Sequence, residues 1–425
     1  MLFKIMIDRD KWQEIFQALR KNKGRTFLTA FGVFWGIFML LVMLGAGQGL
    51  ENGVTQGFGD FATNSVFIWP QRTSMAYKGF DRDRSFNFKD GDVEAMRKTI
   101  PEIQYLAPRL TGGGYGSGDN VVRGERTGNY SINGDHPDFF LIDPVDILEG
   151  RFINEMDIRD RRKVIIIGKR VYEELFEKDE ECIGEYIRIQ GIYFKVVGLF
   201  KSKKTGENAM QDNEAIFMPF TTMQRAYNFG DNVGFLSVTS IDEVPVSIVQ
   251  EKVIDLLKSR HHINPADDLA IGSFNVEKEF KQMKGLFFGI DLLIWIVGIG
   301  TLLAGVIGVS NIMLVIVKER TKEIGIQRAL GATPMHITMQ IINESIFLTS
   351  IAGYIGLVFG VLVIEGVDYM ISQQGDDAGF FMNPEIDFRI AITALVILIF
   401  SGVIAGMIPA RRAINVKPIE ALRTE

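Results

Sequence analysis

Four long stretches of the chain contain no Asp, Glu, Lys or Arg, and each is at least 20 residues long: Thr26–Gly47, Leu292–Val317, Ser345–Ile364 and Ile390–Ala410. An apolar run of ~18 or more residues is long enough to cross the ~30 Å hydrocarbon layer as a helix. Buried helices in a large soluble core are the alternative, which four runs of this length disfavour. The pattern predicts an α-helical membrane protein with four transmembrane helices, at about 26–47, 286–317, 337–365 and 388–410.

Basic residues gather beside some ends of these spans and are absent beside others. They precede span one, lie between spans two and three and follow span four. The connection 366–387 contains several Asp and Glu residues but no Lys or Arg. Lys and Arg near membrane ends are retained on the cytoplasmic side. We therefore expect both termini (1–25 and 411–425) and the connection 318–336 to be cytoplasmic, and residues 48–284 to form a large extracytoplasmic domain.

Residues 3–20 alternate apolar and charged side chains at helical spacing, with Trp12 among the apolar ones. The spacing predicts an amphipathic helix that lies on the inner membrane surface. A helix packed on a cytoplasmic partner is the alternative. The apolar run that follows is longer than the core of a signal peptide, so we expect span one to stay as an anchor.

The segment 48–284 mixes strand and helix patterns, which predicts a large α+β domain. Asp90 is a candidate N-cap for a helix between strands near Asn64–Trp69 and Ile103–Ala107. The simplest arrangement is an α/β lobe at about 60–110 and 214–275, interrupted by a β-rich lobe at about 111–213. Helical periodicity upstream of span two predicts a helical stalk at about 276–289.

The sequence contains no recognisable set of catalytic residues. The net charge is -6, and no segment matches the G-x-x-x-x-G-K-[ST] loop that cradles nucleotide phosphates. The four histidines show no metal-ligand spacing, and the single cysteine, Cys182, can form no internal disulfide. Glu344 stands near the start of span three, where we expect an interfacial position or a contact with a neighbouring helix or subunit.

The strongest motif is V-K-E-R-T-K-E-I-G-I-Q-R-A-L-G-A-T-P at Val317–Pro334. It predicts a short amphipathic helix that Gly331 ends before Pro334. Further motifs are L-E-G-R-F at Leu148–Phe152, V-I-I-I-G-K-R-V-Y-E-E-L-F at Val164–Phe176 and the tail P-A-R-R-A-I-N-V-K-P-I-E-A-L-R at Pro409–Arg423. Together and in this order, these segments resemble the MacB-like, FtsX-related permease family of ABC transporters.

The resemblance implies that 318–336 is a coupling helix that docks into a cytoplasmic ABC ATPase. The contacts that it implies are Glu319, Arg320, Glu323, Ile324, Gly325, Arg328, Ala329 and Gly331. ATP and Mg would then be bound by the ATPase and no cofactor by this chain. MacB carries its ATPase at the N-terminus, whereas this chain begins about 25 residues before span one, so we expect the ATPase as a separate polypeptide.

The resemblance also implies that the α/β lobe is porter-like. It further implies a homodimer or heterodimer in the bacterial inner membrane, which transmits force to the exterior to export substrate. A periplasmic adaptor and an outer-membrane duct are candidate partners, and nucleic acid is not expected. Three alternatives stay open: a permease that extracts lipoproteins, a regulator of cell-wall hydrolases, and a stand-alone membrane enzyme or receptor. The size of 48–284 disfavours the regulator, and the missing catalytic set disfavours the enzyme.

Overall fold

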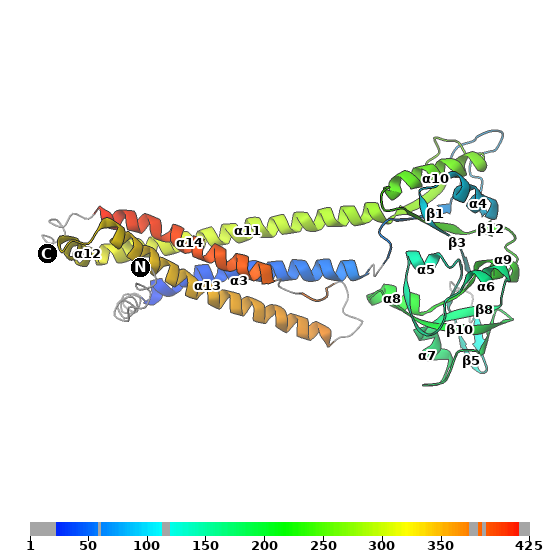
Figure 1. The fold of residues 1–425 in the computed structure, drawn as a ribbon, viewed down its shortest axis with the longest axis horizontal. Helices are drawn as coiled ribbons and strands as arrows, with labels where there is room; N and C mark the ends of the chain where they lie inside the picture. The colour runs from blue at the N-terminus through cyan, green and yellow to red at the C-terminus, as the bar shows by residue number, and fades with distance from the viewer. Residues whose placement is uncertain (1–22, 58–60, 113–119, 374–380, 385–387, 416–425) are drawn as a thin grey trace. The chain divides into compact units, whose positions relative to one another are not determined.

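The computed structural model describes residues 23–57, 61–112, 120–373, 381–384 and 388–415. The predicted N-terminal amphipathic helix and most of the C-terminal tail lie outside these residues. The described chain forms two compact units, a helix bundle and a domain built on a β-sheet, hereafter the sheet domain (Figure 1).

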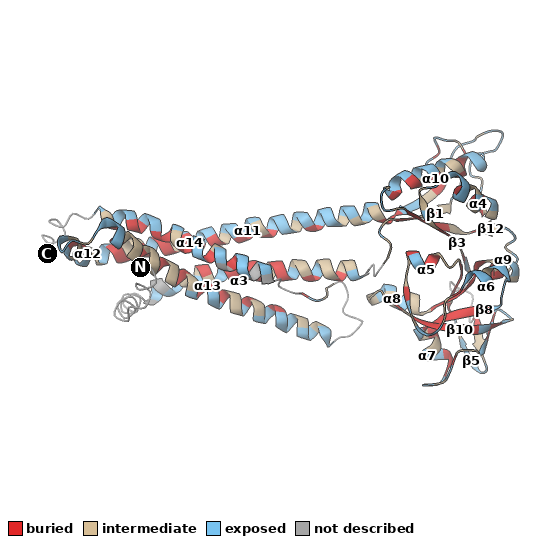
Figure 2. Cartoon of the chain, viewed as in Figure 1, coloured by how far each residue is buried: buried red, intermediate tan, exposed pale blue. Residues whose placement is uncertain are grey.

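Four helices of the bundle are long and apolar enough to cross a membrane. They are α3 (Lys23–Gly57), α11 (Val276–Glu319), α13 (Pro334–Ser372) and α14 (Phe388–Ile414). The apolar side chains divide between a buried inner side and an outer side that stays exposed in the chain, as the colours of Figure 2 show for α11. An outer surface of this composition is what a hydrocarbon solvent requires. The four predicted spans are therefore present as helices.

Small residues let these helices approach closely. A Cβ at Gly356 would lie 2.6 Å from the backbone oxygen of Phe34, and one at Gly305 would lie 3.2 Å from that of Gly32. Gly402 packs in the same way on Ile346 of α13. Pairs of glycines four residues apart, such as Gly402 and Gly406, form the small-xxx-small pattern that favours helix packing in membranes.

We expect Gly402→Leu to destabilise the bundle. Even a Cβ at this position would lie 2.5 Å from Thr349 Oγ1 and 2.8 Å from Ile346 Cα, so a leucine must push α13 and α14 apart. Gly300→Leu is the matched control, because nothing lies within 4 Å of a Cβ there. The thermal midpoint in detergent should fall for the first variant alone; equal midpoints would contradict the packing.

The helices of spans one and three extend well beyond their predicted limits. We expected span one to end near Gly47, before a glycine-rich exit, but α3 continues to Gly57. In the helix, Gly45 packs on Ile364 and Gly49 on Phe381, so these glycines serve close packing instead of ending the helix. Helix α13 likewise runs to Ser372, beyond the predicted limit of 365. The predicted stalk and span two form one helix, α11, whose 44 residues extend about 66 Å.

The sheet domain is built on one sheet of twelve strands, in the order β14-β1-β13-β3-β6-β11-β8-β10-β9-β4-β5, with β7 paired to β10. A separate pair joins β12 to β2. The strands are β1 (Ser65–Pro70), β2 (Phe88–Lys89), β3 (Ile103–Gly112), β4 (Val121–Arg123), β5 (Arg126–Gly128), β6 (Ser131–Asp135), β7 (Val145–Gly150), β8 (Val164–Gly168), β9 (Tyr186–Ile189), β10 (Ile192–Ser202), β11 (Ala215–Pro219), β12 (Asn232–Val233), β13 (Phe235–Ser240) and β14 (Ile271–Asn275).

Short helices accompany the strands: α4 (Asp90–Thr99), α5 (Phe139–Ile142), α6 (Glu155–Arg159), α7 (Lys169–Leu175), α8 (Gly206–Asn213), α9 (Phe220–Ala226) and α10 (Val246–Arg260). Asp90 is not the N-cap of α4, as we had expected, but its first residue. Asp92 performs the capping, because its carboxylate accepts a 2.9 Å hydrogen bond from the backbone N–H of Lys89.

The boundary between the two predicted lobes is wrong on one side. We placed Ala215–Pro219 in the α/β lobe, but β11 pairs with β6 and β8 of the β-rich part. On the other side, β3 belongs to both lobes, since its residues up to Arg109 pair with β13 and its last three pair with β6. A local apolar run predicts a strand but does not show which neighbour it pairs with.

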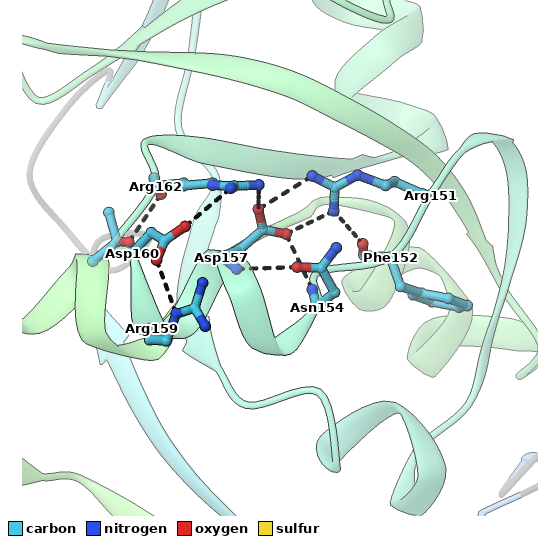
Figure 3. Close-up of polar contacts among 8 residues, drawn as sticks. Arg151, Phe152, Asn154, Asp157, Arg159, Asp160 and Arg162 are labelled. Carbon is cyan, nitrogen blue, oxygen red and sulfur yellow. Dashed lines mark hydrogen bonds and ion pairs between the residues drawn. The ribbon is translucent and has the colours of Figure 1, made fainter.

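The motif Leu148–Phe152 is tied to the following helix by a buried carboxylate (Figure 3). Asp157 in α6 is fully buried, and its oxygens lie 2.6 and 3.2 Å from the terminal nitrogens of Arg151. Arg162 approaches the same carboxylate at 3.6 Å, and the backbone N–H of Asn154 donates to it at 3.1 Å. These donors more than offset the burial and lower the pKa of Asp157.

Candidate functional site

The connection between α11 and α13 is a short helix, α12 (Thr321–Ala329), set off from α11 by Arg320. Its apolar residues do not all face one way. Ile324 is only 8% exposed and belongs to the core of the bundle, whereas Ile326 is 43% exposed. The helix therefore has one side that packs on the chain and one that faces away from it.

The end of α12 is fixed by Gly331, as predicted. Its φ of +101° lies in the left-handed region that glycine adopts without strain. The N–H of Gly331 donates to Arg328 O and that of Ala332 to Gln327 O, at 3.1 and 2.9 Å, which is the Schellman pattern. Pro334 then opens α13 immediately, so the turn between the two helices is short and well defined.

The packed side of α12 is held by two arginines. Arg320 donates to Glu323 at 2.8 Å and to Glu344 of α13 at 3.0 Å, and the side chains of Arg320 and Glu344 are only 16% and 11% exposed. Arg328 donates to the backbone oxygen of Ile414, the last residue of α14. Glu344 thus contacts a neighbouring element, as we expected from its position near the start of span three.

The predicted coupling residues divide between the two sides of α12. Ile324 and Gly325 are buried within the chain. Arg320 and Arg328 are half-buried and hold α12 to the bundle. Exposed side chains or backbone are found at the remaining four, Glu319, Glu323, Ala329 and Gly331.

Sequence reasoning missed the exposed apolar residues. Leu330 is 84% exposed and Ile326 is 43% exposed, one helical turn apart, with the exposed Ala329 beside them. We call these three residues the apolar face of α12. Their neighbours Lys322 and Glu323 are charged and exposed. An exposed apolar patch rimmed by polar side chains marks an interaction site. The amphipathic spacing indicated a helix with an apolar side, but it does not determine which apolar residues are buried in the bundle and which are exposed.

In the sheet domain, His136, Asp138 and Glu155 come together although their sequence spacing gives no metal motif. One ligand atom from each lies within 4.8 Å of the others, which would suit a metal ion geometrically. Asp138 is also paired with Arg97 at 3.2 Å, so its charge is offset within the chain.

Two family models together match most of the chain. Residues 26–256 match the MacB-like periplasmic core domain, and residues 295–418 match the FtsX-like permease C-terminal region, which includes all of α12. Among solved structures, the periplasmic region of MacB from Actinobacillus actinomycetemcomitans is similar at 19% identity and a TM-score of 0.43. That similarity covers 56% of this chain and 98% of the other.

Relatives match over nearly the whole chain. A pyoverdine export ATP-binding/permease protein, PvdT of Pseudomonas entomophila, is 27% identical across 97% of this chain and 59% of its own length. A macrolide export ATP-binding/permease protein, MacB of Acinetobacter baylyi, is 26% identical across 100% of this chain and 61% of its own length. The chain thus spans about three-fifths of the length of these relatives. With both family models matched in order, the chain belongs to the MacB-like, FtsX-related family of ABC transporter permeases.

Proposed function

We propose that the chain works as the permease of an exporter in which a cytoplasmic ABC ATPase docks on the apolar face of α12. The exposure of the apolar face carries this proposal: Leu330 is 84% exposed beside the exposed Ile326 and Ala329, and an exposed apolar patch rimmed by charged side chains marks an interaction site. The charged residues Glu319 and Glu323 are exposed nearby and would form the polar rim of the contact.

The packed side of α12 would transmit movement to the spans. Arg320 joins it to α13 through Glu344, and Arg328 joins it to the end of α14. Helix α11 leads from this connection to the sheet domain without a break. A displacement of α12 by the ATPase would therefore act on three spans at once and pass along α11. This favours a mechanism of mechanical coupling rather than transport through a central pore.

The remaining assignments follow from the same proposal. ATP and Mg would be bound by the ATPase, whether it is a separate polypeptide or not. The permease would act as a homodimer or heterodimer in the inner membrane, with α12 and both termini cytoplasmic and the sheet domain periplasmic. An adaptor and an outer-membrane duct would complete the export path. The relatives named for pyoverdine and macrolide export support export as the activity.

Cysteine labelling tests the sidedness of this arrangement. Cys182 is fully buried, and burial raises the pKa of its thiol to about 11, so it should react slowly with maleimides. In intact spheroplasts, a membrane-impermeant maleimide should label Leu269→Cys in the sheet domain but not Leu330→Cys. Both positions are well exposed, at 66% and 84%. In inverted vesicles prepared without the ATPase, which would cover Leu330, we expect the opposite result.

The unmodified chain is the control for Cys182, and permeabilised membranes should label both variants. Labelling of both positions from the same side in sealed membranes would place α12 and the sheet domain together. The proposal that α12 meets a cytoplasmic ATPase would then be wrong.

A further inference from the structure

One face of the sheet has polar residues at buried positions, where apolar residues are expected. In β6, Ser131, Asn133 and Asp135 alternate with Ile132 and Gly134, so the three polar side chains share a face. Asn133 is 6% exposed and Asp135 is fully buried. Such a departure from the apolar pattern of a buried sheet face is expected at functional sites.

Asp135 faces a cation from the neighbouring strand. Nε of Arg109 in β3 lies 2.9 Å from Oδ1 of Asp135. Neither carboxylate oxygen of Asp135 nor this Nε makes a well-directed hydrogen bond in the described part of the chain. The guanidinium stacks over the ring of Phe139 at 4.2 Å, and none of the described residues accepts a hydrogen bond from its two terminal nitrogens. Buried polar atoms that make no well-directed hydrogen bond require an explanation.

Helix α8 and the residues on either side of it add further charges to this region. Lys204 is paired with Asp143 at 2.8 Å and with Asp212 at 3.0 Å, and Glu214 is paired with Arg170 at 3.0 Å. Burial raises the pKa of Asp135 to about 7, since desolvation outweighs the attraction of Arg109. Buried carboxyls with raised pKa values cluster at functional sites.

Of these groups, Arg109, Asp212 and Glu214 line a cavity of about 320 Å³, which is within the size range of small-ligand sites. Its lining offers Arg109 and the amide side chains of Asn129, Asn133 and Gln211 as donors. The carboxylates of Asp212 and Glu214 are acceptors, and the ring of Phe217 is apolar. One basic and two acidic side chains line it, so the lining carries no net positive charge that would attract an anion.

We propose that this cavity binds an uncharged or cationic amide, such as a segment of peptide. The amide oxygen would accept from the free guanidinium N–H groups of Arg109, and N–H or ammonium groups would donate to Asp212 or Glu214. Side-chain amides of the lining can pair with either edge of such a group. The site is independent of the docking of an ATPase, since all of its residues belong to the sheet domain.

Ligand-observed fluorine NMR on the full chain in detergent tests this site with three small probes. Glycine trifluoroethylamide is a cationic amide, its N-acetyl derivative is neutral, and N-trifluoroacetylglycine is anionic. The signals of the first two should broaden with the wild-type chain, and the signal of the third should not. Arg109→Gln should lower the affinity for these two probes roughly tenfold or more, because a hydrogen bond to a charged group is lost. Their signals should broaden correspondingly less.

Two further variants separate binding from folding. Asn129→Leu changes an exposed residue of the lining, so it should weaken probe binding without disturbing the buried pair of Arg109 and Asp135. This variant tests the site even if Arg109→Gln fails to fold. Arg188→Gln removes an exposed arginine of β9 outside the lining and should leave the broadening unchanged. Unchanged broadening in Asn129→Leu, absence of broadening with the folded wild-type chain, or equal broadening by the anionic probe would overturn the proposal.

Discussion

Replacing Ile326 and Leu330 together by glutamate should abolish stable binding of the ATPase while the chain still inserts and folds. Both side chains point away from the bundle, so the change leaves the packed side of α12 intact. Two new carboxylates would have to be buried unpaired at the contact, and each such charge costs several kcal/mol. The loss should appear as absent co-purification of the ATPase and as ATP hydrolysis that no longer depends on the permease.

The matched control places the same chemical change elsewhere. Leu141 and Leu269 are 55% and 66% exposed in the sheet domain, and their double glutamate variant should retain the ATPase. Gly325→Arg is a poorer test, because Gly325 is buried and an arginine there would disturb the bundle itself. Wild-type recovery of the ATPase by Ile326→Glu/Leu330→Glu would rule out the apolar face as the docking surface.

Asp157→Ala should destabilise the sheet domain by about 3 kcal/mol. The substitution removes a fully buried carboxylate and leaves the guanidinium groups of Arg151 and Arg162 facing each other without it (Figure 3). Breaking a buried pair from one side costs ~3–5 kcal/mol, and the 41% exposure of both arginines favours the lower end of this range. Pulse proteolysis of the full chain in urea measures the free energy of unfolding.

Asp160→Ala is the control from the same loop. Asp160 is 37% exposed and pairs with Arg159 and Arg162 at 3.0 Å, an arrangement typical of surface ion pairs that contribute at most about 1 kcal/mol. We expect its unfolding midpoint to stay close to that of the wild-type chain. If the two variants unfolded alike, the buried carboxylate could not be the element that fixes the Leu148–Phe152 motif.

Several features of the fold were predictable because they depend on near neighbours in the chain. The four spans follow from uncharged length, the strands β1 and β3 from the strand patterns near Asn64–Trp69 and Ile103–Ala107, and the end of α12 from Gly331 before Pro334. Each of these signals acts within one element. Local sequence was less informative about α3. The glycines there were interpreted as the end of a helix, but Gly45 packs against Ile364 and Gly49 against Phe381.

By itself, the sequence determined the four-span plan, the approximate limits of the sheet domain, the helix between spans two and three and the family. Only the tertiary structure decided that β3 and β11 join the two lobes, that Ile324 is buried while Leu330 is exposed, and that Arg109 meets Asp135. The physical reason is that pairing and burial depend on residues distant in the chain: Asp135 is 26 positions from Arg109, and Glu344 is 24 positions from Arg320. Periodicity within one element carries no information about such partners.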